Sequence, residues 1–139
     1  MPKSYYFVVV GCGRLGSKVA GYLSEKGHSV VVMDKNENAF ERLPPEFTGF
    51  TVYGDATEME SLKEAKVNMA DMVLAFTAND NTNFMVAQIA LRIFGVPRVV
   101  AYVHEPENIE LFKEFGIEVV CPILLTFETM KGIFRFLEE

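Results

Sequence analysis

A glycine-rich hexapeptide near the N-terminus is the feature that most constrains the fold of this chain. Residues 11–16 read Gly-Cys-Gly-Arg-Leu-Gly and directly follow the continuous apolar run Tyr5–Val10. The next segment, Leu15–Lys26, has the apolar spacing of a helix and is followed by Gly27, a residue typical of the position after a helix. A buried strand that passes through a glycine turn into a helix predicts the first unit of a parallel sheet covered by helices.

The same alternation of strand and helix continues along the chain. Further strands are predicted at the β-branched runs Val30–Met33, Thr51–Tyr53, Met72–Phe76, Val99–Val103 and Glu118–Cys121. The helices between them are predicted at Glu37–Leu43, around Ser61–Ala65, from Asp80 as N-cap to about Phe94, and at Ile109–Phe115. This order predicts an α/β fold, a Rossmann-like doubly wound parallel sheet of about six strands, in one domain that spans residues 1–139.

Residues from about 123 to 138 are expected to form an amphipathic C-terminal helix. Apolar side chains recur there at helical spacing, at Phe127, Met130, Ile133, Phe134 and Leu137. One interpretation is that this apolar stripe packs on the chain's own sheet.

The glycine loop has the pattern and the context of a phosphate-binding turn. Gly11 permits the tight turn, Gly13 lets a phosphate approach the backbone, and Gly16 lets the helix pack against the strand. Free amides and the helix dipole attract an anion, and Arg14 adds a positive charge. We therefore predict phosphate contacts from Gly11, Cys12, Gly13, Arg14, Leu15 and Gly16.

Asp34 ends the second predicted strand, 18 residues beyond Gly16. A carboxylate at this position accepts hydrogen bonds from the ribose hydroxyls of an adenosine. Its charge disfavours a 2′-phosphate, although the adjacent Lys35 weakens that exclusion. The alternative is that Asp34 only caps the helix that follows.

Two later loops complete the candidate site. Gly54, Asp55 and Ala56 follow the third strand and are expected beside the adenine; the alternative is an ordinary turn before a helix capped by Thr57. Thr77, Ala78 and Asn79 follow the fourth strand and are expected to line the second half of the site, with Asn83 bracing this loop. The predicted ligand is NAD(H) or an adenine nucleotide (AMP, ADP or ATP), and the residues leave the choice open.

The remaining residues argue against several functions. The formal net charge of −6 disfavours nucleic-acid binding, and no apolar run is long enough for a membrane span or a signal peptide. Cys12 and Cys121 lack metal-ligand spacing and are expected to be free thiols in a reducing cytoplasm. His28 falls at the amino end of the sheet, and a structural role is favoured for His104, the single acid–base candidate. We therefore predict a binding module with no catalytic and no metal-binding residues.

Together these landmarks resemble the TrkA N-terminal domain, also called the RCK or KTN domain. The matching residues are Gly11–Gly16, Asp34, Gly54–Thr57, Thr77, Asn79, Asp80, Asn83 and Val100–Val103, which span essentially the whole chain. The resemblance implies a cytoplasmic regulatory subunit that binds NAD(H) or an adenine nucleotide and acts on a membrane potassium transporter or channel. It also implies peripheral attachment to the inner membrane face through that partner, and a dimer in which each C-terminal helix crosses onto its neighbour.

Two positions depart from the family's pattern. Tyr102 stands where the family often has an arginine, and Ile123 stands where an acidic residue usually follows the proline corresponding to Pro122. Phosphate or cation contacts at these positions are therefore not expected. The family's usual C-terminal regulatory subdomain does not follow within the 139 residues, and we expect it on a separate partner chain.

Two other functions are alternatives to the regulatory module. One is a small NAD-dependent oxidoreductase, for which no substrate domain remains outside the predicted sheet. The other is a redox sensor that uses Cys12, because a helix N-terminus can lower the pKa of a thiol. A buried, inert thiol is the favoured interpretation of Cys12.

Overall fold

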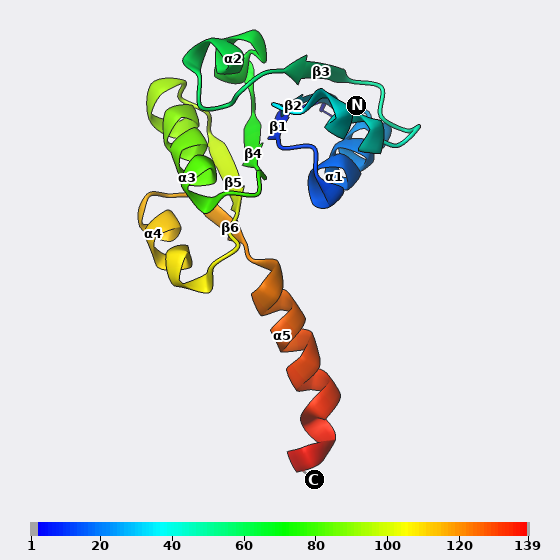
Figure 1. Ribbon diagram of the computed structural model, residues 1–139, viewed down its shortest axis with the longest axis vertical. Coiled ribbons are helices and arrows are strands. Elements are labelled where there is room, and N and C mark those ends of the chain that lie inside the picture. Colours follow the sequence, from blue (N-terminus) through cyan, green and yellow to red (C-terminus); the bar gives the residue numbers. More distant parts are fainter. Residues whose placement is uncertain (1–2, 139) are drawn as a thin grey trace.

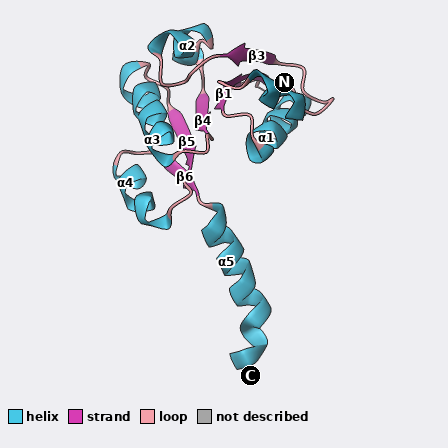
Figure 2. Cartoon of the chain, in the orientation of Figure 1, coloured by secondary structure: helices cyan, strands magenta, loops and turns pink. Residues whose placement is uncertain are grey.

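A six-stranded parallel sheet forms the centre of the protein in the computed structural model, which describes residues 3–138 (Figures 1 and 2). Its spatial order is β3-β2-β1-β4-β5-β6. The strands are β1 (Tyr6–Val10), β2 (Ser29–Asp34), β3 (Phe50–Tyr53), β4 (Met72–Ala75), β5 (Arg98–Tyr102) and β6 (Glu118–Val120). The direction of winding reverses between β1 and β4, which is where open α/β sheets bind ligands. The predicted Rossmann-like architecture is confirmed.

Helices connect each strand to the next. The α-helices are α1 (Arg14–Glu25), α2 (Met59–Glu64), α3 (Asp80–Gln88), α4 (Ile109–Glu114) and α5 (Pro122–Ile133). Short 3-10 turns are η1 (Glu37–Arg42), η2 (Val67–Met69), η4 (Pro106–Asn108) and η5 (Phe134–Glu138), and the π-helical turn η3 (Ile89–Ile93) extends α3. Gly27 and Gly116 follow α1 and α4 with φ angles of 91° and 78°, as expected for glycines that end helices.

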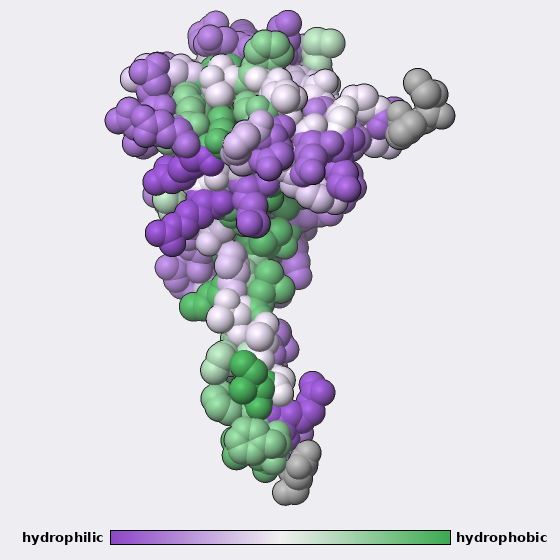
Figure 3. Space-filling view, turned by 90° about the vertical axis from the view of Figure 1, so that its right-hand side faces the viewer, coloured by the Kyte–Doolittle hydropathy of each residue, from purple (hydrophilic) through white to green (hydrophobic). Residues whose placement is uncertain are grey.

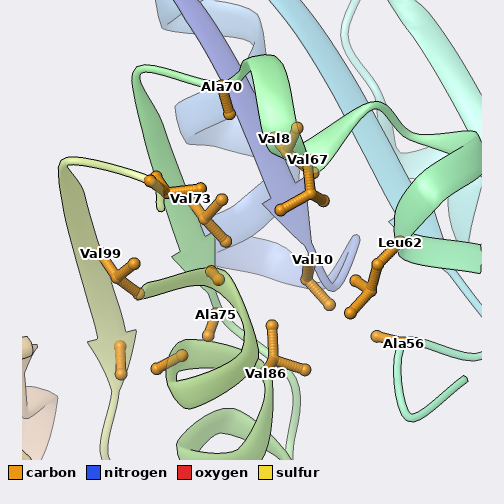
Figure 4. Close-up of a cluster of buried hydrophobic side chains, with 14 of the residues drawn as sticks. Val8, Val10, Ala56, Leu62, Val67, Ala70, Val73, Ala75, Val86 and Val99 are labelled. Atoms are coloured by element: carbon orange, nitrogen blue, oxygen red, sulfur yellow. The ribbon is translucent and has the colours of Figure 1, made fainter. Parts of the chain in front are cut away.

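The sheet is buried on both faces, which explains the unbroken apolar run in β1. Val8 and Val10 point to the face covered by α2, α3 and α4, where they meet Leu62 and Val86 (Figure 4). Val9 points to the opposite face, which is covered by α1 and η1. Successive side chains of a strand alternate between faces, so both faces need apolar residues.

The N-cap of α3 differs from the prediction. Asn79 caps the helix, because its Oδ1 accepts a hydrogen bond of 2.9 Å from the amide of Thr82. The carboxylate of Asp80 accepts hydrogen bonds from three donors of the segment after β5, namely the amides of His104 (2.7 Å) and Glu105 (3.0 Å) and the side-chain amide of Asn108 (2.9 Å). Asp80 therefore ties α3 to that segment.

The C-terminal helix extends away from the sheet (Figure 1). Beyond Pro122, every residue of α5 and η5 is exposed, with Phe127 57% and Leu137 70% exposed. Apolar side chains gather on this extension in the space-filling view (Figure 3). The interpretation that the stripe packs on its own sheet is therefore wrong. No helix within residues 3–138 combines the length and the apolar character that a membrane crossing requires.

Candidate functional site

A cavity of about 330 Å³ opens at the carboxyl edge of the sheet, where the order of strands reverses. Its wall combines loops that are far apart in the sequence. The lining residues are Val10, Gly11, Cys12, Gly13, Met33, Asp34, Lys35, Asn36, Ala39, Arg42, Gly54, Asp55, Ala56, Thr57, Phe76, Thr77, Ala78, Asn79 and Thr82. Eleven of the predicted site residues are among them.

The three glycines of the loop have different surroundings. Gly11 has a φ of 108°, and a Cβ atom on it would lie 2.4 Å from the carbonyl oxygen of Phe76. A Cβ atom on Gly16 would lie 2.1 Å from the carbonyl oxygen of Gly11, so the helix and the turn are in direct contact. Nothing lies within 4 Å of the same position on Gly13, which lines the cavity. This geometry leaves the backbone at Gly13 open to an approaching phosphate.

The N-terminus of α1 lies beside this opening. Gly13 is the N-cap residue and has no side chain to cap the helix, and the first turn of α1 contains no acidic residue. The amides of a first helical turn have no partner inside the helix. Together with the helix dipole, they favour an anion here.

Asp34 is held against the glycine loop by hydrogen bonds at both of its carboxylate oxygens. Its Oδ2 accepts a hydrogen bond of 2.8 Å from the amide of Cys12, and its Oδ1 accepts one of 2.8 Å from the amide of Asn36. Asn36, not Asp34, is the N-cap of η1. The alternative that Asp34 only caps this helix is therefore wrong. Each carboxylate oxygen has a second acceptor position for a ribose hydroxyl.

The loop after β3 forms a small hydrogen-bonded turn. Oδ1 of Asp55 accepts from the hydroxyl of Thr57 (2.7 Å) and from its amide (2.9 Å). These bonds lower the pKa of Asp55 from its usual value, the hydroxyl contributing most. Ala56 is buried and lines the cavity. Thr57 thus bonds to Asp55, and the N-cap of α2 is Glu58.

The loop after β4 is braced from behind by Asn83. Its Oδ1 accepts from the amide (2.9 Å) and the hydroxyl (2.6 Å) of Thr77. Its Nδ2 donates to the carbonyl oxygens of Thr77 (3.0 Å) and Tyr102 (2.8 Å). The side chain is fully buried and is absent from the cavity wall, so Asn83 braces the loop and does not itself line the cavity. Thr77, Ala78 and Asn79 do line the cavity.

Three other predicted residues also lie outside the cavity wall. Gly16 supports the turn from below, and Leu15 packs into the core beneath α1. Arg14 lines a separate hollow on the outer face of α1.

Sequence reasoning missed Arg42, whose Nη1 donates to the carbonyl oxygen of Cys12 at 3.4 Å. Arg42 reaches the glycine loop because η1 folds back beside α1, and no local pattern marks such a contact. It also missed Thr82, Phe76 and several apolar residues of the wall. Phe76 directly precedes the predicted residue Thr77, and Thr82 lies three residues after the predicted residue Asn79. Their proximity to this loop is the sequence signal that marks them.

Cys12 is unsuited to redox sensing. Burial raises the pKa of its thiol to about 11, the nearby Asp34 carboxylate adds to this rise, and Arg42 offsets part of it. The side chain is fully buried. The burial agrees with the favoured interpretation of an inert thiol and not with a pKa lowered by the helix N-terminus, since desolvation disfavours the thiolate. Cys12 and Cys121 are both free, as predicted.

The two histidines make structural contacts. Nδ1 of His28 accepts from the amide of Tyr5 (3.1 Å) at the amino end of the sheet. Nε2 of His104 lies 3.2 Å from the carbonyl oxygen of Thr77, and its ring lies 4.3 Å from the ring of Tyr102. Neither side chain lines the cavity.

Comparison with known proteins identifies the family of the chain. The model of the TrkA-N domain family matches residues 7–122, a range that contains every segment of the cavity wall. This chain belongs to the TrkA-N domain family. The family resemblance expected from the glycine loop and the later motifs is thereby confirmed.

Relatives of this TrkA-N domain include named potassium uptake proteins. The Trk system potassium uptake protein TrkA of Streptomyces coelicolor is 34% identical over 125 residues, which are 90% of this chain and 56% of that protein. The TrkA homolog of Methanothermobacter thermautotrophicus is 32% identical over 118 residues, 84% of this chain and 54% of that protein. The chain thus spans little more than half the length of these relatives.

Solved structures share the fold of this TrkA-N domain. The GsuK RCK domain has a TM-score of 0.78 and 25% identity, with 99% of this chain and 30% of that chain covered. The GsuK channel bound to NAD has a TM-score of 0.70 and 23% identity, covering 86% and 22% of the two chains. The AMP-bound C-terminal domain of a Kef protein from Shewanella denitrificans has a TM-score of 0.72 and 17% identity, covering 92% and 81%.

Proposed function

We propose that this chain is the nucleotide-sensing part of a potassium transporter or channel. It binds NAD(H) or an adenine nucleotide and couples occupancy of the cavity to ion transport. One observation carries the proposal: the carboxylate of Asp34 is fixed on the amide of Cys12 at the mouth of a glycine loop whose backbone is open at Gly13. A ribose diol and an adjoining phosphate match these two features.

The extent of the cavity supports a ligand with two ends. The segment Gly54–Thr57 lies on the β3 side of the glycine loop, and Thr77–Asn79 lies on the β4 side. An adenosine fits the first side, and a second nucleoside or further phosphates fit the other. The NAD-bound GsuK channel and the AMP-bound Kef domain, which have this fold, support the same class of ligand.

Calorimetry with NAD, NADH, AMP, ADP and ATP tests the binding step. At least one of them should bind the native chain with heat release and raise its melting temperature by mass action. NADH should remain unoxidised in the presence of small carbonyl compounds. The cavity wall contains no histidine, and no acid–base pair lies beside the part of the cavity that Thr77–Asn79 line. If none of the five ligands bound, the proposal would be wrong.

The C-terminal helix supports an assembly of at least two copies. The α1 face of the sheet is only partly buried at three residues of β5 and β6, namely Val100, Tyr102 and Val120. The α5 helix of the same chain extends away from the sheet and does not cover these residues. The α5 of a second copy can cover this face. A nucleotide then shifts the dimer between arrangements in proportion to its difference in affinity for them.

The coupling step requires a membrane partner. A potassium transporter or channel subunit would hold the dimer peripherally at the cytoplasmic face of the membrane. Potassium flux into vesicles that contain the partner transporter, measured with and without this chain and nucleotide, tests the coupling. A potassium flux that changes with neither addition would contradict the proposed coupling.

A further inference from the structure

Three aromatic rings connect the wall of the nucleotide cavity with the α1 face of the sheet. Phe76 directly follows β4, is buried and lines the cavity. Its ring centroid lies 6.1 Å from that of Tyr102, in an edge-to-face arrangement with an interplanar angle of 73°. The ring centroid of Tyr102 in turn lies 4.3 Å from that of His104. We call these three residues the aromatic ladder; Tyr102 and His104 lie outside the cavity wall.

The backbone that carries the aromatic ladder is held in place. Nδ2 of Asn83 donates to the carbonyl oxygens of Thr77 (3.0 Å) and Tyr102 (2.8 Å), which joins the ends of β4 and β5. Asn83 is fully buried, and Nε2 of His104 also lies 3.2 Å from the carbonyl oxygen of Thr77. Because these bonds hold the two strand ends together, a displacement of the Phe76 ring is passed to the ring that it contacts.

Tyr102 also borders an uncovered surface. It lies beside Val120 in the sheet, on the α1 face that the α5 helix of the same chain leaves uncovered (Figure 1). Tyr102 departs from the family pattern, and its ring makes this face more apolar than an arginine would. The same side chain therefore contacts the cavity wall through Phe76 and borders the face on which the α5 of a second copy is proposed to lie.

We propose that Tyr102 is a positioning residue that couples nucleotide binding to self-association of the chain. The α5 of a second copy, seated on Tyr102, holds its ring against Phe76 and so orders the cavity wall. A nucleotide in the cavity orders the same ring contact from the other side. Each binding event reduces the ordering that the other still requires, and thermodynamic linkage makes the two effects equal. The inference rests on the proposed nucleotide binding and the proposed dimer.

Analytical ultracentrifugation of the whole chain, with and without saturating NAD, AMP or ATP, measures the coupling. In wild type, at least one of these nucleotides should lower the dimer dissociation constant by about tenfold. Calorimetry gives the reciprocal value, because the same nucleotide should bind about tenfold more tightly at protein concentrations above the dimer dissociation constant than below it. Equal affinity at the two protein concentrations would overturn the proposal without the use of any variant.

Three variants separate coupling from packing. Tyr102→Leu removes the ring, and the effect of the nucleotide on the dimer dissociation constant should fall from about tenfold to less than about twofold. Tyr102→Phe keeps the ring and should keep the effect. The control Tyr53→Leu makes the same exchange at a tyrosine that is 63% exposed on β3, at the opposite edge of the sheet from β6, and should also keep it.

The outcomes distinguish the coupling from the proposals beneath it. A Tyr102→Leu dimer that is weaker than wild type but still tightens about tenfold with nucleotide would show that the ring only fills the interface, which refutes the coupling. Loss of the effect in Tyr53→Leu as well would refute a specific role of Tyr102. If no nucleotide binds, the proposed function fails, and if the wild-type chain stays monomeric, the proposed dimer fails. The coupling falls with either one, whereas a dimer that binds nucleotide without any change in its dissociation constant removes the coupling alone.

Discussion

The amide of Cys12 donates a hydrogen bond of 2.8 Å to Oδ2 of Asp34, which joins the glycine loop to the end of β2. The two residues are 22 positions apart in the sequence. The bond fixes the backbone of the glycine loop relative to the carboxylate of Asp34, the two groups to which we assign the phosphate and the ribose. Such preorganisation reduces the ordering that binding requires.

Replacing Asp34 should weaken nucleotide binding strongly. In Asp34→Ala the ribose hydroxyls lose a charged acceptor, and hydrogen bonds to charged groups contribute roughly 1.5–3 kcal/mol. Affinity measured by calorimetry should therefore fall by about tenfold to a hundredfold. The matched control is Asp71→Ala, because Oδ2 of Asp71 accepts from the amide of Tyr6 (2.8 Å) at the opposite edge of the sheet. An equal loss of nucleotide affinity in both variants would mean that Asp34 affects binding only through the stability of the fold.

Two glycines of the loop should separate folding from binding. Gly16→Ala places a Cβ atom 2.1 Å from the carbonyl oxygen of Gly11, so it should lower the free energy of unfolding by roughly 2–4 kcal/mol. Gly13→Ala meets nothing within 4 Å and should melt near wild type, yet its methyl group would obstruct a phosphate. Thermal melts and calorimetry on the two variants check this. A Gly13→Ala variant with wild-type affinity would place the phosphate elsewhere.

The acid stability of the fold should depend on Asp80. Burial of Asp80 opposes its ionisation, but hydrogen bonds from His104, Asn108 and Glu105 outweigh burial and lower the pKa of the carboxyl. A lowered pKa stabilises the folded state above the unfolded pKa of about 3.9, and that contribution disappears as the pH falls through the folded pKa. At pH 7, Asp80→Asn should lower the free energy of unfolding by about 1–3 kcal/mol.

Denaturant titrations of Asp80→Asn and wild type between neutral and acid pH provide the measurement. The difference between the two proteins should shrink below about pH 4. Glu107→Gln is the control, since Glu107 is an exposed carboxylate in the same segment. A difference that stays constant with pH would show that the charge of Asp80 contributes nothing.

Cys12 should react slowly with alkylating agents. With a thiol pKa of about 11, raised by burial and then by Asp34, roughly one thiol in a thousand is ionised at pH 8. Iodoacetamide should therefore label the native chain much more slowly than the unfolded chain, and mass spectrometry of peptides assigns the label. Asp34→Asn should leave labelling slow, because burial is the larger cause. Rapid labelling of native Cys12 would restore the redox interpretation.

The exposed face of α5 should hold a dimer together. Phe127→Glu puts a charge on an apolar residue that is 57% exposed, and it should shift the mass in analytical ultracentrifugation from dimer to monomer. Glu128→Gln, at the neighbouring exposed position on the same helix, should leave the mass unchanged. A wild-type chain that stays monomeric at high micromolar concentration would refute the dimer.

The fold and most of the cavity wall were predictable from local patterns. The apolar run Tyr5–Val10, the spacing of the three glycines and the carboxylate at Asp34 each follow from a constraint within a few residues. Parallel strands place their carboxyl ends at one edge, so the loops at Gly54 and Thr77 had to meet there. Local chemistry and right-handed connections are sufficient for these features.

Tertiary structure decided the features that depend on distant neighbours. By residue type, either Asn79 or Asp80 can cap α3. Asn79 is the cap in the structure, because the carboxylate of Asp80 accepts hydrogen bonds from the segment around His104 instead. Arg42 entered the wall because η1 folds back on the glycine loop, and the thiol of Cys12 gained its high pKa from burial. A sequence pattern specifies which side chains are available, whereas desolvation and contact partners exist only once the chain is folded.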